Sequence, residues 1–477
     1  MLYVATEVAP FAKTGGLADV AGSLPTALSR LGHQVIVVMP GYSQIKQEKI
    51  RVTEFPVPVN GHREAALVSQ IADGSDNGDQ VPVYLMGNFQ YFDREAMYGC
   101  QDDGERFAFF CRAVLEMLPR LDFQPDIIHC NDWQTGPICL LLQEEYRKQP
   151  FYRNTASIYT IHNLQYQGIF GKEALGWLGL GEEYFDPDSL EFYGRINFTK
   201  GGLVYSDKIN AVSETYAREI QTPEFGEGLE GVLQQRFRDL AGIVNGIDHA
   251  EYDPEHDTTL KYNYSAAHPE PKGQNKFELQ KELGLDQEDV PLLGLVSRLV
   301  EQKGLSLVEE ILPDLLKRQV QLVFLGSGDP AYEKLFTSLA AKYPGRVSAV
   351  ISFDSALAKR IYAGADIFLM PSRFEPCGLG QLIALRYGTI PVVRKTGGLA
   401  DTIRDYDHET EGNGFVFEAY EARNFLQALE RALTLYQQDR KAWDELVRLA
   451  MSEDCSWAKS ALAYQQLYGE ALKKVRG

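Results

Sequence analysis

Two cations, Arg298 and Lys303, are the residues of this sequence best placed to do chemistry. Arg298 closely follows an apolar run at residues 292–296, and Lys303 precedes a helix-like pattern. An arginine fork and a lysine point charge in a strand-loop-helix setting can hold a diphosphate and stabilise it as a leaving group. An isolated pair at this spacing is more often two solvated surface charges, so the setting is what favours an anion site.

A carboxylate, Glu375, follows a second strongly apolar run at residues 367–370. At a strand end it could bind sugar hydroxyls or face positive charge developing at an anomeric carbon, although a helix-capping glutamate is the plainer alternative. Gly378, Leu379 and Gly380 should then open a helix and expose backbone N–H groups. No base lies near Cys377 in the sequence, which favours a packing or site-shaping role over a nucleophile.

Polar residues also end two apolar runs in the first half of the chain. His162 and Asn163 follow residues 157–161 and lead into a loop with Tyr166, while Asp132 and Trp133 follow residues 126–130. The histidine beside an amide could read sugar hydroxyls, or it could be a satisfied structural residue. The tryptophan could equally stack on a sugar face or fill a gap between a helix and the sheet.

A seven-residue sequence, Lys-Thr-Gly-Gly-Leu-Ala-Asp, occurs twice, at residues 13–19 and again at residues 395–401. Gly15 and Gly16, like Gly397 and Gly398, would let the backbone approach a ligand closely. A helix N-terminus behind each loop favours negative charge, and Lys13 adds a mobile cation. The repeated unit suits an anionic or polyhydroxylated ligand.

Other motifs are weak or missing. The Gly326-Ser327-Gly328 loop could approach a nucleotide or could be an ordinary strand-to-helix turn. The sequence has no Walker motif, no GxGxxG with an acidic partner, no HExxH and no serine nucleophile motif. The six cysteines form no metal-binding spacing, which leads us to expect no metal site and a reducing compartment.

Short β-branched runs alternate with helical patterns along the whole chain, which predicts parallel sheets covered by helices on both faces. The expected strands are residues 2–8, 34–39, 81–86, 126–130, 157–161, 208–212, 292–296, 321–325, 347–352, 367–370 and 390–393. The fold class is therefore α/β, with two doubly wound Rossmann-like domains. Ligands of such folds lie at the carboxyl ends of the strands, where the polar residues above occur.

The expected domain boundary is near Asn245, before a polar stretch at residues 249–273 that is typical of a loop. We therefore assign residues 1–245 to the first domain and residues 246–455 to the second. Residues 456–477 should form one amphipathic helix that could return to the first domain. Its expected apolar stripe consists of Trp457, Leu462, Leu467 and Leu472.

The composition is that of a globular protein: 477 residues, 44% hydrophobic and 24% charged. A net charge of −19 argues against nucleic-acid or anionic-membrane partners. No apolar stretch is long enough to span a membrane, and residues 2–5 lack the basic start and cleavage site of a signal peptide. These features predict a cytoplasmic protein.

Taken together, these motifs closely resemble those of the bacterial glycogen synthases and plant starch synthases. The resemblance covers essentially the whole chain. The segments that carry it are residues 13–19, 162–168, 245–248, 297–304, 372–379 and 395–401. It implies a GT-B fold, with the two domains facing a central cleft that closes over the donor. It also implies transfer of glucose from ADP-glucose to the non-reducing 4-OH of an α-1,4-glucan (glycogen or a maltooligosaccharide), with retention.

The resemblance also assigns residues. The implied catalytic residues are Glu375, His162, Lys303 and Arg298. The implied donor-binding residues are Lys13, Gly15, Gly16, Asp19, Asn163, Asn245, Arg298, Lys303, Phe353, Cys377, Gly378, Leu379, Gly397 and Gly398. Asp132, Trp133, Tyr166 and Phe92 are expected on the acceptor side, where Phe170 could also stack. No cofactor or metal is expected, because fixed cations can stabilise the departing ADP, and retention without an evident nucleophile suggests same-face displacement.

Three positions depart from the family pattern. Gly380 stands where bacterial relatives often have threonine, and Phe353 where an aromatic near adenine is often tyrosine. Ile383 occupies the position of a second acidic residue that is common in the wider superfamily, so ribose must be recognised elsewhere. The first two changes bear on the preference for the donor.

Three alternatives remain. A related glucosyltransferase could use UDP-glucose, and a protein of the same fold could bind glucan or act as an initiation scaffold without catalysis. The retained Lys13, His162, Arg298, Lys303 and Glu375 argue against the scaffold. A phosphorylase would carry a pyridoxal lysine in a longer chain and would show cofactor absorbance.

Overall fold

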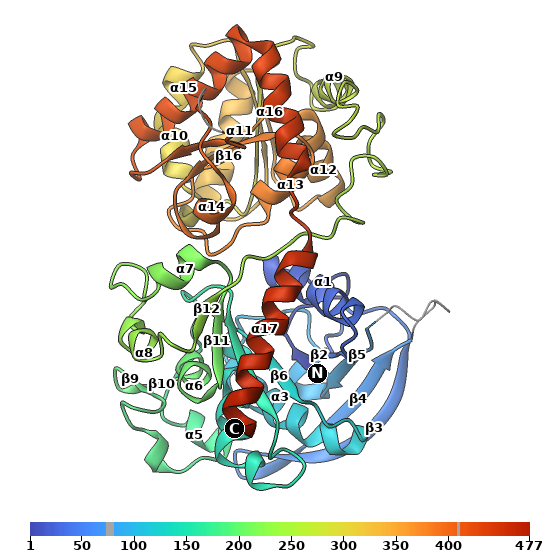
Figure 1. Cartoon of the computed structure of the whole chain (residues 1–477), viewed down its shortest axis with the longest axis vertical. Helices are drawn as coiled ribbons and strands as arrows, with labels where there is room; N and C mark the ends of the chain where they lie inside the picture. The colour runs from blue at the N-terminus through green and yellow to red at the C-terminus, as the bar shows by residue number, and fades with distance from the viewer. Residues whose placement is uncertain (73–80, 408–410) are drawn as a thin grey trace. The chain divides into compact units, whose positions relative to one another are not determined.

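The structure, a computed structural model, describes residues 1–72, 81–407 and 411–477. The chain forms two compact units, shown in Figure 1. The first unit consists of residues 1–245 and 457–477, and the second of residues 246–456. Each unit contains its own mainly parallel sheet with helices packed on it, so the predicted fold class is confirmed.

The sheet of the first unit has the strand order β12-β11-β7-β6-β1-β2-β5-β4-β3. All neighbours from β12 to β5 are parallel, and β4 is antiparallel to both β5 and β3. The strand bounds are β1 (Leu2–Val4), β2 (Ile36–Pro40), β3 (Lys49–Val59), β4 (His62–Ile71), β5 (Val83–Gly87), β6 (Ile127–Asn131), β7 (Ala156–Ile161), β11 (Lys208–Ala211) and β12 (Leu240–Gly242). A separate small sheet contains β8 (Ile169–Phe170), β9 (Glu191–Phe192) and β10 (Arg195–Asn197).

The sheet of the second unit has the order β15-β14-β13-β16-β17-β18, and all its strands are parallel. The bounds are β13 (Leu292–Val296), β14 (Gln321–Leu325), β15 (Val347–Val350), β16 (Ile367–Met370), β17 (Ile390–Arg394) and β18 (Phe415–Phe417). Numbered within the unit, this is the order 3-2-1-4-5-6, so the direction of winding reverses between β13 and β16. The same reversal occurs in the first unit between β1 and β6.

Helices complete both units (Figure 1). Those of the first unit are α1 (Gly16–Arg30), α2 (Phe89–Phe92), α3 (Asp103–Met117), α4 (Gly136–Glu144), α5 (Ala174–Leu178), α6 (Phe198–Tyr205), α7 (Glu214–Glu219), α8 (Glu230–Gln235) and α17 (Trp457–Arg476). Those of the second are α9 (Lys272–Glu282), α10 (Leu305–Leu315), α11 (Pro330–Lys342), α12 (Ser355–Gly364), α13 (Gly380–Arg386), α14 (Gly397–Thr402), α15 (Ala422–Gln438) and α16 (Arg440–Ser452). Among the described residues, no helix combines the length and apolar character needed to cross a membrane.

The last helix, α17, packs on α1 and on strands β7 and β11 of the first unit. Its buried face differs from the predicted stripe. Leu462 is 55% exposed, and Leu472 is only partly buried. The buried face consists of Trp457, Ser460, Ala461, Tyr464, Leu467, Tyr468 and Ala471. These residues recur at helical spacing, and Leu462 falls outside that pattern.

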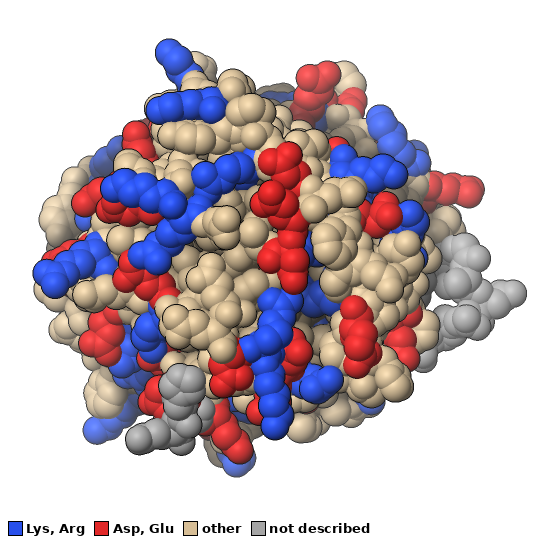
Figure 2. All heavy atoms as spheres, turned by 90° about the horizontal axis from the view of Figure 1, so that it is seen from above, with Lys and Arg blue, Asp and Glu red and all other residues tan. Residues whose placement is uncertain are grey.

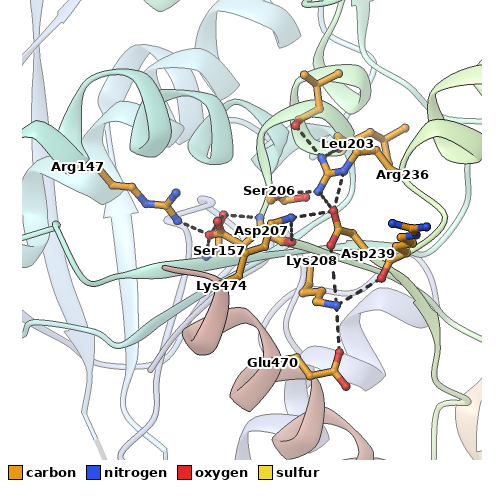
Figure 3. Close-up of polar contacts among 12 residues, drawn as sticks. Arg147, Ser157, Leu203, Ser206, Asp207, Lys208, Arg236, Asp239, Glu470 and Lys474 are labelled. Atoms are coloured by element: carbon orange, nitrogen blue, oxygen red, sulfur yellow. Dashed lines mark hydrogen bonds and ion pairs between the residues drawn. The ribbon is translucent and has the colours of Figure 1, made fainter. Parts of the chain in front are cut away.

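A polar network attaches the end of α17 to the sheet, as Figure 3 shows. Lys474 Nζ donates to the backbone oxygen of Asp207 (3.1 Å) and pairs with Asp239 (2.7 Å). Glu470 Oε2 lies 3.0 Å from Lys208 Nζ. The Asp207 carboxylate in turn accepts from the backbone N–H (2.7 Å) and hydroxyl (3.0 Å) of Ser157. Neighbouring strands β7 and β11 and the helix are thereby held together.

Charge is distributed with both signs interspersed on the face that Figure 2 shows, where lysine and arginine side chains alternate with aspartate and glutamate. On this face the described residues form no continuous basic surface of the kind that nucleic-acid binding requires.

Candidate functional site

The switch point of the second unit brings Lys303 and Glu375 into contact. Lys303 follows β13 and Glu375 follows β16, and these two strands are parallel neighbours. Lys303 Nζ lies 2.7 Å from Glu375 Oε2, and the Ser372 hydroxyl donates to the same oxygen (2.9 Å). Glu375 is only 6% exposed, so water screens the attraction between its carboxylate and Lys303 less than it would in a surface pair. The spacing of these residues in the sequence does not reveal this direct contact.

A glycine allows the two loops to meet. Gly304 has φ +71°, and a Cβ there would lie 1.9 Å from the backbone oxygen of Pro371. The Arg373 N–H donates to the backbone oxygen of Gln302 (2.9 Å), and the Gln302 amide donates to the backbone oxygen of Phe374 (3.3 Å). Because these bonds join the loops directly, Lys303 is held beside the Glu375 carboxylate.

Arg298 lies in the same loop as Lys303 and is exposed. Within the described part of the chain its guanidinium has no hydrogen-bond or ion-pair partner, which leaves its donors available to a ligand. The Gly326-Ser327-Gly328 loop supports its backbone: Leu299 N–H donates to the Ser327 oxygen (2.9 Å), and a Cβ on Gly326 would lie 1.9 Å from the Ser297 oxygen. In this structure that loop packs against the loop that carries Arg298.

The two copies of the repeated heptapeptide have different surroundings. A Cβ on Gly397 would lie 2.0 Å from the Glu375 oxygen, and one on Gly398 would lie 2.1 Å from the Cys377 oxygen. The Gly398 N–H also donates to the Glu375 oxygen (3.1 Å). A Cβ on Gly15, in the first copy, would meet nothing within 4 Å. The second copy therefore packs against the Glu375 segment, and donor contact by these glycines stays a prediction.

This difference predicts that the same substitution will destabilise the protein in the second copy and have little effect in the first. Gly397→Ala is expected to lower the free energy of unfolding by about 1–3 kcal/mol, because the added methyl group must displace the Glu375 backbone. Gly15→Ala is the matched control and should change it by less than about 0.5 kcal/mol. Urea titrations of both variants measure the effect, and equal losses would contradict the packing role of Gly397.

The switch point of the first unit carries the first copy of the heptapeptide after β1. Lys13 Nζ pairs with Asp19 Oδ1 at 2.5 Å. Burial raises the pKa of Asp19, and the nearby Lys13 ammonium offsets only part of this effect. The Glu7 carboxylate accepts hydrogen bonds from the Gly15 N–H (3.0 Å) and the Tyr98 hydroxyl (2.9 Å). It also accepts from the backbone N–H and the hydroxyl of Thr14. Glu7 was not predicted as a site residue, although it is a carboxylate at the end of an apolar run.

His162 and Asp132 lie on neighbouring loops after β7 and β6. Asp132 Oδ1 accepts from the His162 backbone N–H (2.7 Å), and His162 Nε2 lies 2.9 Å from Asn131 Oδ1. Burial lowers the pKa of His162 to about 3, so the ring is neutral at physiological pH. Burial raises the pKa of Asp132 to about 7, an effect that bonds from the His162 and Asn163 N–H groups only partly offset.

Asp132 also has an unusual backbone conformation, with φ +56° and ψ −179°. This region is normally restricted to glycine, and strained residues of this kind concentrate at functional sites. The Asn163 side chain accepts from the Gln165 N–H (3.1 Å) and shapes the loop that presents Tyr166. These placements leave the assigned roles of Asp132 and Asn163 as predictions.

His129, a fully buried histidine of β6, predicts a pH dependence of stability. Burial, with a smaller effect of His162, lowers its pKa from 6.5 to about 3. Between these pH values the unfolded chain binds a proton that the folded chain does not, so stability falls as pH falls from 6.5 toward 3. His129→Gln should reduce this slope by about 1.4 kcal/mol per pH unit in urea titrations between pH 4 and 6. The exposed His268→Gln is the control, and an unchanged slope in His129→Gln would contradict the assignment.

The aromatic residues assigned to the acceptor side have different environments. Phe92 was wrongly assigned: it is 0% exposed and packs among Tyr42, Tyr91 and Phe109, so it has no face to offer a sugar. Trp133 is partly buried and fills space against Phe107, Phe170 and Phe198, while Tyr166 is 51% exposed.

The remaining residues assigned to the donor also differ in how exposed they are. Phe353, after β15, is 80% exposed and available for stacking. Cys377 is buried, and its backbone oxygen accepts from the Gln381 amide (3.0 Å). Asn245 is 6% exposed, and its Oδ1 has no partner among the described residues. The other assigned positions lie at helix starts: Gly16 begins α1, and Gly378 and Leu379 precede α13.

Two groups of potential metal ligands occur in the described part of the chain. They are Cys100, Asp102 and Asp103, and Asp253, Glu255 and His256. In each group other side chains already bind a carboxylate: Arg94 binds Asp102 and Arg386 binds Asp253. Neither group includes a residue of the sites described above.

Comparison with known proteins identifies the family. The starch synthase catalytic domain matches residues 1–235, and glycosyl transferases group 1 matches residues 276–448. The glycogen synthase of Desulforudis audaxviator (strain MP104C) is 55% identical over 485 residues, covering 100% of this chain and 97% of that protein. The glycogen synthase of Moorella thermoacetica (strain ATCC 39073 / JCM 9320) is 54% identical over 477 residues, with the same coverage.

A solved structure agrees with the sequence comparison. It is the catalytic domain of starch synthase IV from Arabidopsis thaliana bound to ADP and acarbose. It aligns with a TM-score of 0.93 and 36% identity, covering 99% of each chain. The chain therefore belongs to the glycogen synthase and starch synthase family of glucosyltransferases.

Proposed function

We propose that this glucosyltransferase transfers glucose from ADP-glucose to the non-reducing 4-OH of an α-1,4-glucan, with retention of configuration. The observation that carries the proposal is the Lys303–Glu375 pair, with the unpartnered Arg298 in the same loop. The related starch synthase IV, solved with ADP and acarbose, supports a nucleotide and a glucan-like sugar as ligands.

The cations account for departure of ADP. As the bond between the anomeric carbon and phosphate breaks, negative charge grows on the diphosphate, and fixed cations stabilise that charge most where water is excluded. Arg298 offers a planar fork of donors, and Lys303 retains N–H groups beyond the one that it gives to Glu375. Together they would hold the diphosphate.

Glu375 and His162 would act on the sugar. Glu375 Oε2 accepts two hydrogen bonds, so within the described residues Oε1 remains open to a sugar hydroxyl or to positive charge at the anomeric carbon. Because the His162 ring is neutral, it can form hydrogen bonds with sugar hydroxyls without placing a positive charge in the site. Retention would follow from same-face displacement, in which the departing phosphate helps to deprotonate the incoming hydroxyl. A trapped covalent glucosyl-enzyme would overturn this step.

We also propose that the reaction needs no metal ion, because Arg298 and Lys303 can supply the positive charge. Dialysis against EDTA should leave kcat within about twofold of the untreated enzyme, since no ligand in the scheme would be lost. Loss of activity on EDTA treatment, and recovery with a divalent cation, would contradict this.

Transfer of radiolabelled glucose tests the proposal. Label from ADP-glucose should enter glycogen in linkages that an α-1,4-specific exo-hydrolase releases, and ADP-glucose should turn over faster than UDP-glucose. Faster turnover of UDP-glucose would assign the other donor. Undetectable transfer with intact glucan binding would instead indicate a scaffold.

A further inference from the structure

A buried amide lies directly behind His162. Asn131, the last residue of β6, is 0% exposed. Its Nδ2 donates to the backbone oxygen of Val4 (2.9 Å), and its Oδ1 accepts from the hydroxyl of Tyr3 (3.0 Å). His162 Nε2 lies 2.9 Å from the same Oδ1. Three strand ends, those of β1, β6 and β7, therefore meet at one side chain.

These contacts define which ring nitrogen of His162 carries the proton. The Val4 oxygen can only accept a hydrogen bond, so the amide nitrogen of Asn131 must face it and Oδ1 must face His162. Because Oδ1 can only accept, His162 Nε2 must be the protonated nitrogen. The ring is neutral, since burial lowers the pKa of His162 to about 3. Nδ1 therefore carries a lone pair and no proton.

Nδ1 has no hydrogen-bond partner among the described residues. The ring is held at Nε2 by Asn131, and the His162 backbone is held by Asp132. We propose that Asn131 is a positioning residue that fixes the tautomer of His162, so that Nδ1 accepts a hydroxyl hydrogen from the transferred sugar. This inference rests on the glucosyl transfer proposed above and adds a residue that contacts no substrate itself.

Packing behind Asn131 makes the arrangement rigid. The Tyr3 ring lies on edge against His129, with ring centroids 4.7 Å apart. His129 is bonded through Nδ1 to the Tyr468 hydroxyl of α17 (2.8 Å) and through Nε2 to the Thr160 hydroxyl (2.7 Å). Tyr3 therefore has little freedom to release Asn131 Oδ1, which is the acceptor that the described residues offer to His162 Nε2.

Histidine NMR tests the tautomer directly in the full chain. The protein contains eight histidines, so labelling only these with ¹⁵N gives a spectrum simple enough to assign by loss of one signal in His162→Gln. The wild-type protein should show His162 protonated at Nε2 and unprotonated at Nδ1. Titration with ADP-glucose, without glucan, should shift the Nδ1 signal in the direction of a nitrogen that accepts a hydrogen bond.

Kinetics of Asn131→Leu test the consequence. Removing the acceptor should lower kcat about tenfold to a hundredfold, as loss of a supporting hydrogen bond commonly does, while the KM for ADP-glucose changes less than about threefold. The His162 proton should no longer be confined to Nε2. Asn210→Leu is the control, because Asn210 is an equally buried amide of the same sheet that donates to Tyr464. It should leave the His162 tautomer and kcat near wild type.

Three results would overturn the inference. They are a wild-type His162 protonated at Nδ1, an Nδ1 signal that does not respond to bound ADP-glucose, and wild-type kcat in Asn131→Leu. If Asn131→Leu does not fold, the two wild-type spectra still decide. Any of these results alongside normal glucosyl transfer rejects the role of Asn131 alone, whereas absence of transfer from ADP-glucose in the wild type rejects the proposed function.

Discussion

Replacing Lys303 with alanine is expected to lower kcat for glucosyl transfer at least about a hundredfold. The substitution removes a cation from the developing diphosphate charge. It also leaves the Glu375 carboxylate, 6% exposed, without the ammonium group that now lies 2.7 Å away. An uncompensated carboxylate beside an anionic donor would repel it, so both effects act in the same direction. Steady-state kinetics with ADP-glucose and glycogen measure the loss.

Lys317→Ala is the matched control for Lys303→Ala. Lys317 follows α10, the helix that begins after Gly304, and its side chain is 74% exposed in a pair with Asp314. Its removal should leave kcat within about twofold, because an exposed pair contributes little. A fall of less than about threefold in Lys303→Ala would show that the role of this lysine is misassigned.

Glu375→Ala is expected to lower kcat by at least about a hundredfold as well. The carboxylate is held by Lys303 and by the Ser372 hydroxyl on one oxygen, which leaves the other oxygen for the sugar. Glu375→Gln keeps the shape and removes the charge. If charge opposite the anomeric carbon is what matters, kcat should also fall at least about tenfold in this variant, with a smaller change in KM.

The control for Glu375 is Glu282→Ala. Glu282 is an exposed residue at the end of α9, and its Oε1 lies 2.7 Å from Arg360 Nη2. Its removal should leave kcat near wild type. Full activity in Glu375→Gln would show that hydrogen bonding, rather than charge, is the contribution of this residue. Activity within about threefold of wild type in Glu375→Ala would remove Glu375 from the site.

The sequence predicted the parallel strands well because buried strands are short, apolar and β-branched. β13, β14 and β16 have the predicted bounds, and β1 is shorter than predicted because it ends at Val4 and the chain bends at Thr6. The long hairpin of β3 and β4 was missed although its signal was present. Residues 55–59 alternate between buried and exposed, and Asn60-Gly61 forms the turn with positive φ at both residues.

The site residues could be predicted only to the extent that the carboxyl ends of parallel strands meet at one edge of a sheet. That rule selected Lys303 and Glu375, whose contact depends on which strands are neighbours. The order 3-2-1-4-5-6 places β16 beside β13, and this pairing cannot be read from the two segments separately. Glu7 was missed because its bonds to the loop at Thr14 and Gly15 are tertiary contacts, which a carboxylate at the end of an apolar run does not by itself reveal.

Errors occurred where tertiary packing decided exposure. Phe92, at the end of α2, is enclosed by other aromatic rings, whereas Tyr166, in the loop after β7, is 51% exposed. The buried face of α17 was wrongly predicted because it was assigned from the positions of the leucines and not from helical spacing. Two tyrosines, Tyr464 and Tyr468, lie on the buried face. Both tyrosines bond to polar residues of the sheet, which makes their burial favourable.

A crystal structure of Glu375→Gln with ADP-glucose would show whether Arg298 and Lys303 hold the donor diphosphate, because slow turnover should preserve the donor. We expect a diphosphate within hydrogen-bond distance of Arg298 and Lys303, with the anomeric carbon of glucose facing residue 375. A donor bound with its diphosphate away from both cations would contradict it.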